Sequence, residues 1–196
     1  MLRRLTPREI LAALAQQWER SLADEWLAAI RSITSDVVLK RLLERLERGD
    51  VHGAVELLGI EADRFSRFER CILAAYNAGD VATVDGMPLL RDPSGNRVVF
   101  TWGVRNQPAE QQLARHAASL VDDLVGEQLT VARQVLTDGL SRGRNPRQTA
   151  LALVGRINRR TGLREGGILG LTSSQAATLD RIYLGLRSGD TQAMRD

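Results

Sequence analysis

The fold is decided by the stretch from residue 106 to residue 143, NQPAEQQLARHAASLVDDLVGEQLTVARQVLTDGLSRG. Asn106, Pro108 and Glu110 form a helix start, and Gly143 stands where a helix would end. Between them, apolar residues recur at helical spacing along one stripe: Leu113, Ala117, Leu120, Leu124, Val131 and Val135. This spacing predicts the longest helix of the chain, with one apolar face.

The residues before this stretch predict further helices. Thr6, Pro7 and Glu9 form a helix start with a capping box. An apolar residue then recurs every four residues, at Ile10, Leu14, Trp18, Leu22, Trp26 and Ile30. The part of this stripe with Trp18, Leu22 and Trp26 suits either the core or a surface for a partner helix. Shorter helices are predicted at 35–48, 51–58 and 62–78, and each is followed by a glycine.

Residues 89–102 have a different pattern. The turn-forming residues 92–96 (DPSGN) are followed by a β-branched and aromatic run, which predicts a β-hairpin. A lone hairpin is marginal in water, so it must pack on helices or on another chain. The predicted fold is therefore mainly α, an elongated helical bundle with one small β-hairpin. It has an N-terminal helical bundle at 1–87 and an arm at 88–196, formed by the hairpin and the long helix with an Arg/Gly-rich loop.

The composition allows a core and indicates no special chemistry. Hydrophobic residues make up 43% of the 196 residues, which is ordinary for a globular protein, and the net charge is only +3. The first residues, MLRRLTPREILAAL, have charges spaced through them and resemble neither a signal peptide nor a membrane span. This predicts synthesis in the cytoplasm and no membrane association. Cys71 is the only cysteine, and no paired Cys or His spacing predicts a metal site or a cofactor.

No catalytic residues are predicted. His52 and His116 are the only histidines, and neither lies near a nucleophile motif. Asp122 and Asp123 are neighbours on a predicted helix, so their carboxylates do not share a site. The glycine-rich run at 166–170 lacks the lysine of a phosphate-binding loop. We therefore expect that the protein is not an enzyme.

Residues 143–175, GRNPRQTALALVGRINRRTGLREGGILGLTSSQ, contain the strongest candidate for a contact site. They predict a short capped helix, an arginine-rich loop punctuated by glycines, and a second capped helix start. The candidate contact residues are Arg144, Arg147, Arg156, Arg159, Arg160 and Arg164, against one acid, Glu165. Because a guanidinium binds phosphate and carboxylate groups in a bidentate manner, these residues suit DNA phosphate or an acidic protein surface. The alternative is a solvated loop whose arginines form only weak surface ion pairs.

Residues 88–190 also resemble a known family, the Mu-like head-morphogenesis proteins, which are minor head proteins of tailed phages. The resemblance is carried by FTWGVRNQPAE at 100–110, GRNP at 143–146, GRIN at 155–158, REGG at 164–167 and GLTS at 170–173. In that family the chain usually continues into a further helical domain with an Arg-Thr-Glu-type motif. The sequence here stops at Asp196, so no role of that domain is carried over.

The resemblance implies a non-enzymatic virion protein, made in the host cytoplasm, that associates with the portal protein. Such a protein supports head assembly and DNA packaging or ejection. Packaged double-stranded DNA and a ring of identical copies are further partners that the resemblance leaves open. Two other functions are also open: a DNA-binding regulator that uses residues 145–188 as a helix-turn-helix-like segment, and a carrier segment for an enzyme domain.

Overall fold

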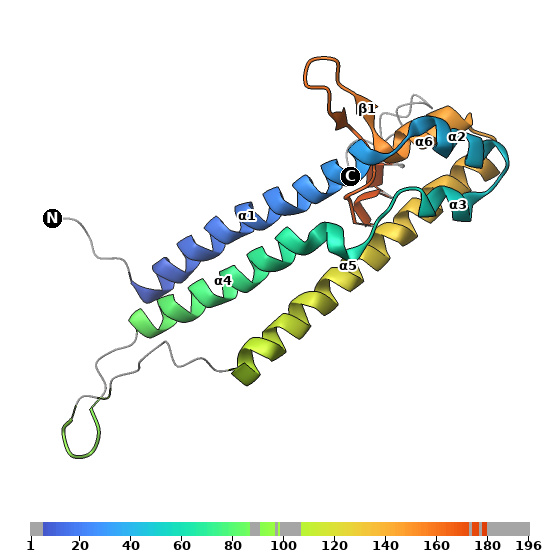
Figure 1. Ribbon diagram of the computed structural model, residues 1–196. Helices are drawn as coiled ribbons and strands as arrows, with labels where there is room; N and C mark the ends of the chain where they lie inside the picture. The colour runs from blue at the N-terminus through green and yellow to red at the C-terminus, as the bar shows by residue number, and fades with distance from the viewer. Residues whose placement is uncertain are drawn as a thin grey trace. The chain divides into compact units, whose positions relative to one another are not determined.

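The computed structural model describes residues 6–86, 91–96, 98, 107–172, 174–176, 178 and 179. Within these residues the chain forms six α-helices, one short 3₁₀ helix and one two-stranded hairpin (Figure 1). The elements are α1 Pro7–Asp36, α2 Leu39–Glu47, α3 Val51–Glu56, η1 Ala62–Phe65, α4 Ser66–Asp85, α5 Gln107–Ser141, α6 Pro146–Val154, β1 Arg156–Ile157 and β2 Arg164–Glu165. The prediction of a mainly α helical bundle with one small β-hairpin is confirmed.

The helices form two compact units, and each unit combines two separate parts of the chain. Unit 1 consists of the described residues within Met1–Trp26 and Phe65–Val121, and unit 2 of those within Leu27–Arg64 and Asp122–Asp196. Helices α1 and α5 each contribute residues to both units. The predicted domain boundary at residue 88 lies outside the described residues and stays a prediction.

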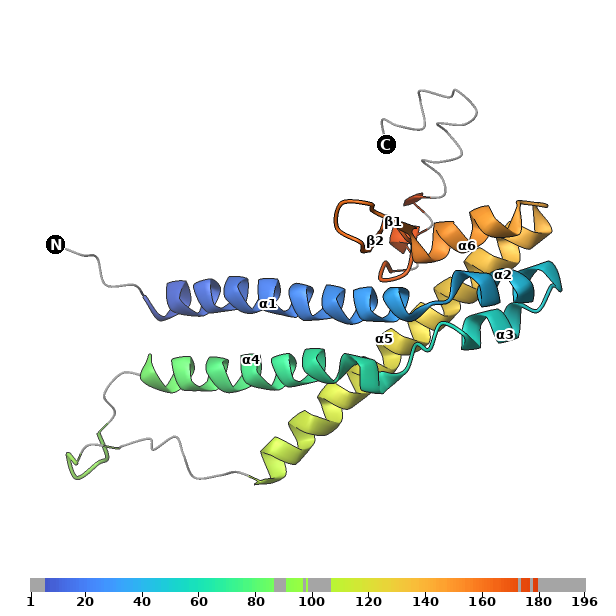
Figure 2. The same cartoon turned by 45° about the horizontal axis from the view of Figure 1, so that its top comes forward.

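In unit 1 the first part of α1 lies antiparallel beside α4, as Figures 1 and 2 both show. The predicted capping box begins α1, because the Glu9 backbone N–H donates to Thr6 Oγ1 at 3.3 Å and the Thr6 N–H donates to Glu9 Oε2 at 2.8 Å. At the other end of the unit, Trp26 stacks on Phe65 with ring centroids 4.9 Å apart and meets the edge of Phe68 at 5.7 Å.

Helix α4 runs further than its sequence predicts. Gly79 was expected to end the helix, but it lies inside α4, which continues to Asp85 and is capped by Gly86. The prediction was wrong because the chain after Gly79 still packs on α1: a Cβ added to Gly86 would lie 3.2 Å from Cβ of Pro7. Tertiary packing thus extends the helix through a residue of low helix propensity.

Unit 2 has a core of branched aliphatic side chains. Helix α2 packs on both α3 and α6, and the most deeply buried side chains of the unit include Ile33, Leu42, Leu46, Leu136, Leu153 and Val154. Asn145 caps α6 as predicted, because its Oδ1 accepts a hydrogen bond from the Arg147 N–H at 2.8 Å. Helices α5 and α6 cross closely, since a Cβ at Gly139 would overlap the Thr149 side chain.

The hairpin described by the structure is not the one that the sequence predicted. At 89–102, only the turn and single flanking residues lie within the described part; Asp92 N–H donates to the Asn96 carbonyl at 2.9 Å. The rest of both predicted arms lies outside the described residues, so this hairpin stays a prediction. The described hairpin consists of β1 and β2, in a segment predicted to be a loop, and its two-residue strands are too short to give an alternating pattern.

Candidate interaction site

The β1–β2 hairpin carries several of the predicted contact arginines. Its strands are antiparallel, with Arg156 opposite Glu165 and Ile157 opposite Arg164. The Asn158 N–H donates to the Leu163 carbonyl at 2.8 Å, and the Gly162 N–H donates to the Asn158 carbonyl at the same distance. Gly162 has a φ of 70°, which a residue with a side chain rarely adopts. The backbone of the turn is therefore well defined.

Side-chain hydrogen bonds fix the turn further. Asn158 Nδ2 donates to Glu165 Oε2 at 2.9 Å, and Thr161 Oγ1 donates to Glu165 Oε1 at 3.2 Å. Asn158 Oδ1 accepts from the Arg160 backbone N–H at 2.8 Å. The only acid of residues 143–175 is thus bound to two neutral side chains. Across the described ranges, Glu165 forms no ion pair with an arginine.

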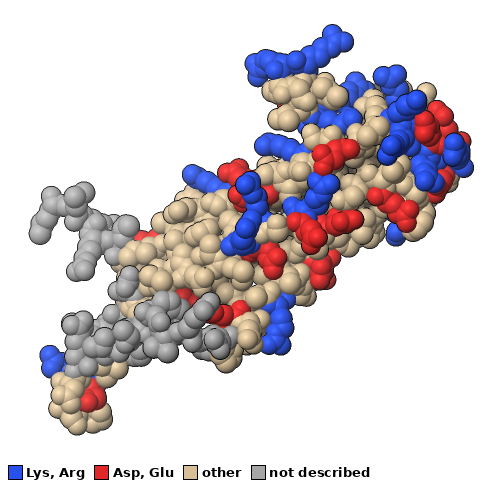
Figure 3. Space-filling view, in the orientation of Figure 1, with Lys and Arg blue, Asp and Glu red and all other residues tan. Residues whose placement is uncertain are grey.

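Arg147, Arg156, Arg159 and Arg160 are exposed. Within the part of the chain that the structure describes, their guanidinium groups form no ion pair and no hydrogen bond. Figure 3 shows Lys and Arg surface at the top of the view, above uncharged surface. These side chains are therefore available to another molecule.

Arg164 has a different environment from the exposed arginines. It is half-buried, and its Nη1 donates to the Gly155 carbonyl while its Nη2 donates to the Val37 carbonyl, both at 3.3 Å. The second bond ties the hairpin to the segment that follows α1. Arg164 thus holds the hairpin in place within unit 2, a role that the sequence did not indicate.

Two glycines allow the chain to enter and leave the hairpin. Gly155 has a φ of 81°, and a Cβ there would lie 2.6 Å from the Glu165 carbonyl oxygen. A Cβ at Gly167 would lie 2.6 Å from the Leu153 carbonyl oxygen. After the hairpin the chain returns along the end of α6, where the Leu169 N–H donates to the Leu153 carbonyl at 3.1 Å. The backbone segments are therefore too close for any residue with a side chain.

Gln128 is a positioning residue that sequence reasoning missed. It lies on α5 with only 1% of its surface exposed. Its Nε2 donates to the Leu171 carbonyl at 2.9 Å, and its Oε1 accepts from the Gly170 N–H at 2.8 Å. A signal was present, because Gln128 is a polar residue at a buried position of the apolar α5 face. It fixes the chain that returns from the hairpin.

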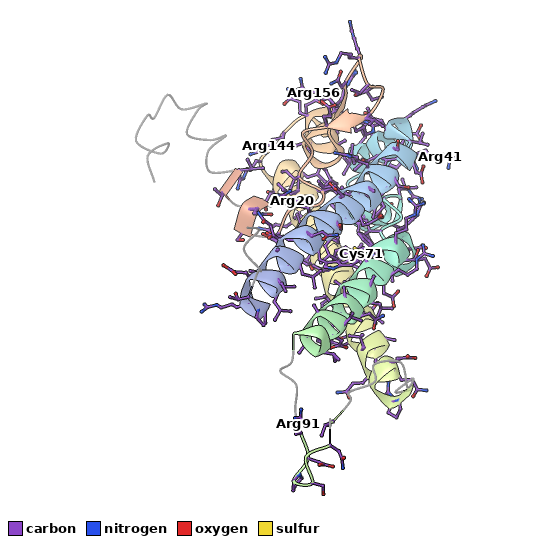
Figure 4. All side chains as sticks on the ribbon, turned by 90° about the vertical axis from the view of Figure 1, so that its left-hand side faces the viewer. Arg20, Arg41, Cys71, Arg91, Arg144 and Arg156 are labelled. Carbon is purple, nitrogen blue, oxygen red and sulfur yellow. The ribbon has the colours of Figure 1, made fainter. Side chains whose placement is uncertain are left out.

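An open pocket of about 440 Å³ lies beside α6 and the base of the hairpin. It is lined by Arg144, Gln148, Thr149, Leu151, Ala152, Arg156, Glu165, Gly166, Ile168 and Leu179. Figure 4 labels Arg144 and Arg156, which come from the segment before α6 and from β1 respectively. The structure therefore brings these two predicted contact residues to one pocket.

The predicted partner-helix stripe is partly covered within unit 1. Trp18, Leu22 and Trp26 are all half-buried. Trp26 packs on aromatic rings at the start of α4, and the Trp18 Nε1 is buried without a hydrogen-bond partner. A part of the stripe therefore packs within unit 1. The contact of the stripe with a helix of a partner stays a prediction.

The described residues contain no group of three His, Cys, Asp or Glu side chains that could hold a metal ion. His52 lies 3.2 Å from Glu56 on the exposed face of α3, in an ordinary i,i+4 pair. Burial raises the pKa of the Cys71 thiol, and the nearby Glu25 raises it further, so the reactive thiolate is disfavoured. None of the described helices is both long enough and apolar enough to span a membrane.

Comparison of the chain with protein-family models, with curated proteins and with solved structures gives no significant match. Two observations remain as support for a function. One is the resemblance carried by GRNP, GRIN, REGG and GLTS. The other is the geometry of the hairpin, which that same segment forms.

Proposed function

We propose that this protein is a phage virion structural protein of the minor head, or head-morphogenesis, type. It associates with the portal protein and supports head assembly and DNA packaging or ejection, without a catalytic activity of its own. In this proposal it is made in the host cytoplasm and incorporated into the virion. Packaged double-stranded DNA and other copies in a ring are its further partners.

The observation that carries the proposal is the hydrogen-bonded hairpin, whose Arg159 and Arg160 guanidinium groups have no partner among the described residues. Arg159 and Arg160 are exposed at the turn, and Glu165 accepts hydrogen bonds from Asn158 and Thr161. A guanidinium without an internal partner gains most from a carboxylate or phosphate of another molecule. The hairpin therefore supports a role in assembly with an acidic partner.

The alternative is a DNA-binding regulator that uses residues 145–188 as a helix-turn-helix-like segment. In that motif a turn of about three to four residues joins two helices, and the second helix enters the major groove. Here α6 ends at Val154, and the hairpin and a loop occupy residues 155–171 before helical residues begin again at Ser174. This geometry favours the assembly protein over the regulator.

Association with the portal protein tests the proposal directly. The full chain would be produced together with the portal protein of the same phage, and the assembled ring would be isolated by size exclusion. We expect the chain to elute with the ring at physiological salt. Absence from the ring, combined with sequence-specific binding to a DNA duplex at the same salt, would overturn the proposal in favour of the regulator.

A further inference from the structure

The turn of the β1–β2 hairpin presents aliphatic side chains together with its arginines. We refer to residues 157–163 as the hairpin tip. Ile157 is 59% exposed and Leu163 is 44% exposed, and they flank Arg159 and Arg160 in the sequence. Single exposed aliphatic residues are common on protein surfaces. Because Ile157 pairs with Arg164 in the antiparallel register, Leu163 lies on the opposite face of the hairpin, so the tip presents one exposed aliphatic side chain on each face beside two arginines.

The tip is also held in one conformation before it meets a partner. The hydrogen bonds of Asn158 and Thr161 with Glu165 close the turn, and Arg164 fixes its base to the Val37 carbonyl. A preorganised loop loses less conformational entropy on binding than a flexible one. The exposed side chains are thus presented on a rigid support.

We propose that the hairpin tip is the docking element toward the portal, and that it fits an apolar depression bordered by carboxylates. The tip would enter the depression end-on, with Ile157 and Leu163 against opposite walls, and Arg159 and Arg160 would pair with the carboxylates. This inference rests on the proposed function, which names the portal protein as the partner. It adds which residues of this chain make the contact and what kind of surface on the portal receives them.

The aliphatic side chains favour a protein partner over duplex DNA. Protein interfaces bury aliphatic side chains together with arginines, so a protein partner can cover Ile157 and Leu163 while it pairs with the tip arginines. Most contacts to DNA go to phosphate and sugar, which bind the arginines but leave the aliphatic groups without a partner. Insertion of an aliphatic wedge into the minor groove is the exception, and a duplex probe detects it.

The test compares two double variants of the full chain, Ile157→Ser with Leu163→Ser and Arg159→Ser with Arg160→Ser. Their affinities for the assembled portal ring and for a short DNA duplex would be measured by calorimetry at two salt concentrations. We expect each variant to bind the ring at least about tenfold more weakly, as is typical of central interface residues. The apolar variant should bind the duplex as the wild-type chain does.

Matched controls lie on exposed positions of unit 1. Arg67→Ser with Arg70→Ser removes the same charge, and Val81→Ser with Leu120→Ser removes exposed aliphatic groups. Both controls should bind the ring like the wild-type chain. Far-UV circular dichroism and melting temperature establish that each variant is folded, which the exposure of the replaced side chains leads us to expect.

The outcomes separate the inference from the proposed function. If the wild-type chain binds the ring and both tip variants bind equally well, the inference is wrong and the proposed function stands. If the apolar variant loses duplex affinity, the tip is a DNA wedge and the inference is overturned. If the wild-type chain does not bind the ring at all, the proposed function fails and the inference fails with it.

Discussion

Replacing Gln128 with methionine should destabilise unit 2 through the loss of two hydrogen bonds. Methionine has nearly the shape and volume of glutamine, so the substitution leaves little cavity. It removes the acceptor of the Gly170 N–H, bonded at 2.8 Å, and the donor to the Leu171 carbonyl, bonded at 2.9 Å. Since Gln128 is 1% exposed, water does not reach the space that its amide occupies.

The magnitude follows from the two backbone groups that lose their hydrogen bond to Gln128. A buried donor or acceptor left unsatisfied costs about 1–3 kcal/mol. Gly170 and Leu171 are half-buried, so the middle of this range applies, and two groups together give about 3–5 kcal/mol. Burial of the more apolar methionine offsets about 1 kcal/mol. The expected loss in free energy of unfolding is therefore about 2–4 kcal/mol.

Urea denaturation of the full chain, followed by far-UV circular dichroism, measures this loss. The melting temperature should fall by about 4–16 °C, given about 2–4 °C for each kcal/mol in a chain of this size. Gln134→Met is the matched control, because Gln134 is exposed on the same helix. A difference below about 0.5 kcal/mol between the two variants would refute the role of Gln128, since such changes are usual for surface substitutions.

Two further predictions concern the backbone and the helix caps. Gly155→Ala should lower the stability measured in thermal melts by about 2 kcal/mol or more, because Gly155 has a φ of 81° and a Cβ there would clash with the Glu165 carbonyl. Gly162→Ala should cost only about 1 kcal/mol, because Gly162 has a φ of 70° but open space around it. Equal losses in the two variants would contradict this reasoning. A hydrogen bond from the Gly53 N–H lowers the pKa of Asp50, and a hydrogen bond from the Arg45 side chain lowers it further. The charged Asp50 carboxylate therefore stabilises the fold fully above the usual Asp pKa, and this stabilisation is lost as the pH falls through the lowered pKa. Asp50→Asn keeps a capping group but does not titrate, so melting temperatures measured over a pH series should lose this decrease at acid pH. A pH profile identical to that of the wild-type chain would contradict the prediction.

The helices were predictable because their signals are local. Thr6 and Asn145 cap α1 and α6 with their own side chains, and Gly143, with a φ of 62°, follows α5. Each of these features acts within a few residues, so the sequence contains all of its determinants. Gly79 shows the limit of such reasoning, since the packing of α4 on α1 outweighs the local stop signal.

The hairpin and its supports were not predictable in the same way. Each strand has two residues, and the pairing depends on the contact of Asn158 with Glu165 across the turn. The anchor from Arg164 to the Val37 carbonyl spans 127 positions of the chain, and the clamp from Gln128 to Gly170 spans 42. Contacts at such separations leave no periodic pattern, and only the tertiary structure shows them.

The structure also divides a set of arginines that the sequence presents as equivalent. Arg164 binds two backbone carbonyls, and a charged donor lost at such a site costs about 1.5–3 kcal/mol. Replacing Arg164 together with the tip arginines would therefore lower stability and affinity at once, and the two effects could not be separated. Arg159 and Arg160 are exposed and unpaired among the described residues, so their replacement changes charge with little effect on folding. A loss of partner binding in that double variant, with Arg164 left in place, would thus report on the contact surface itself.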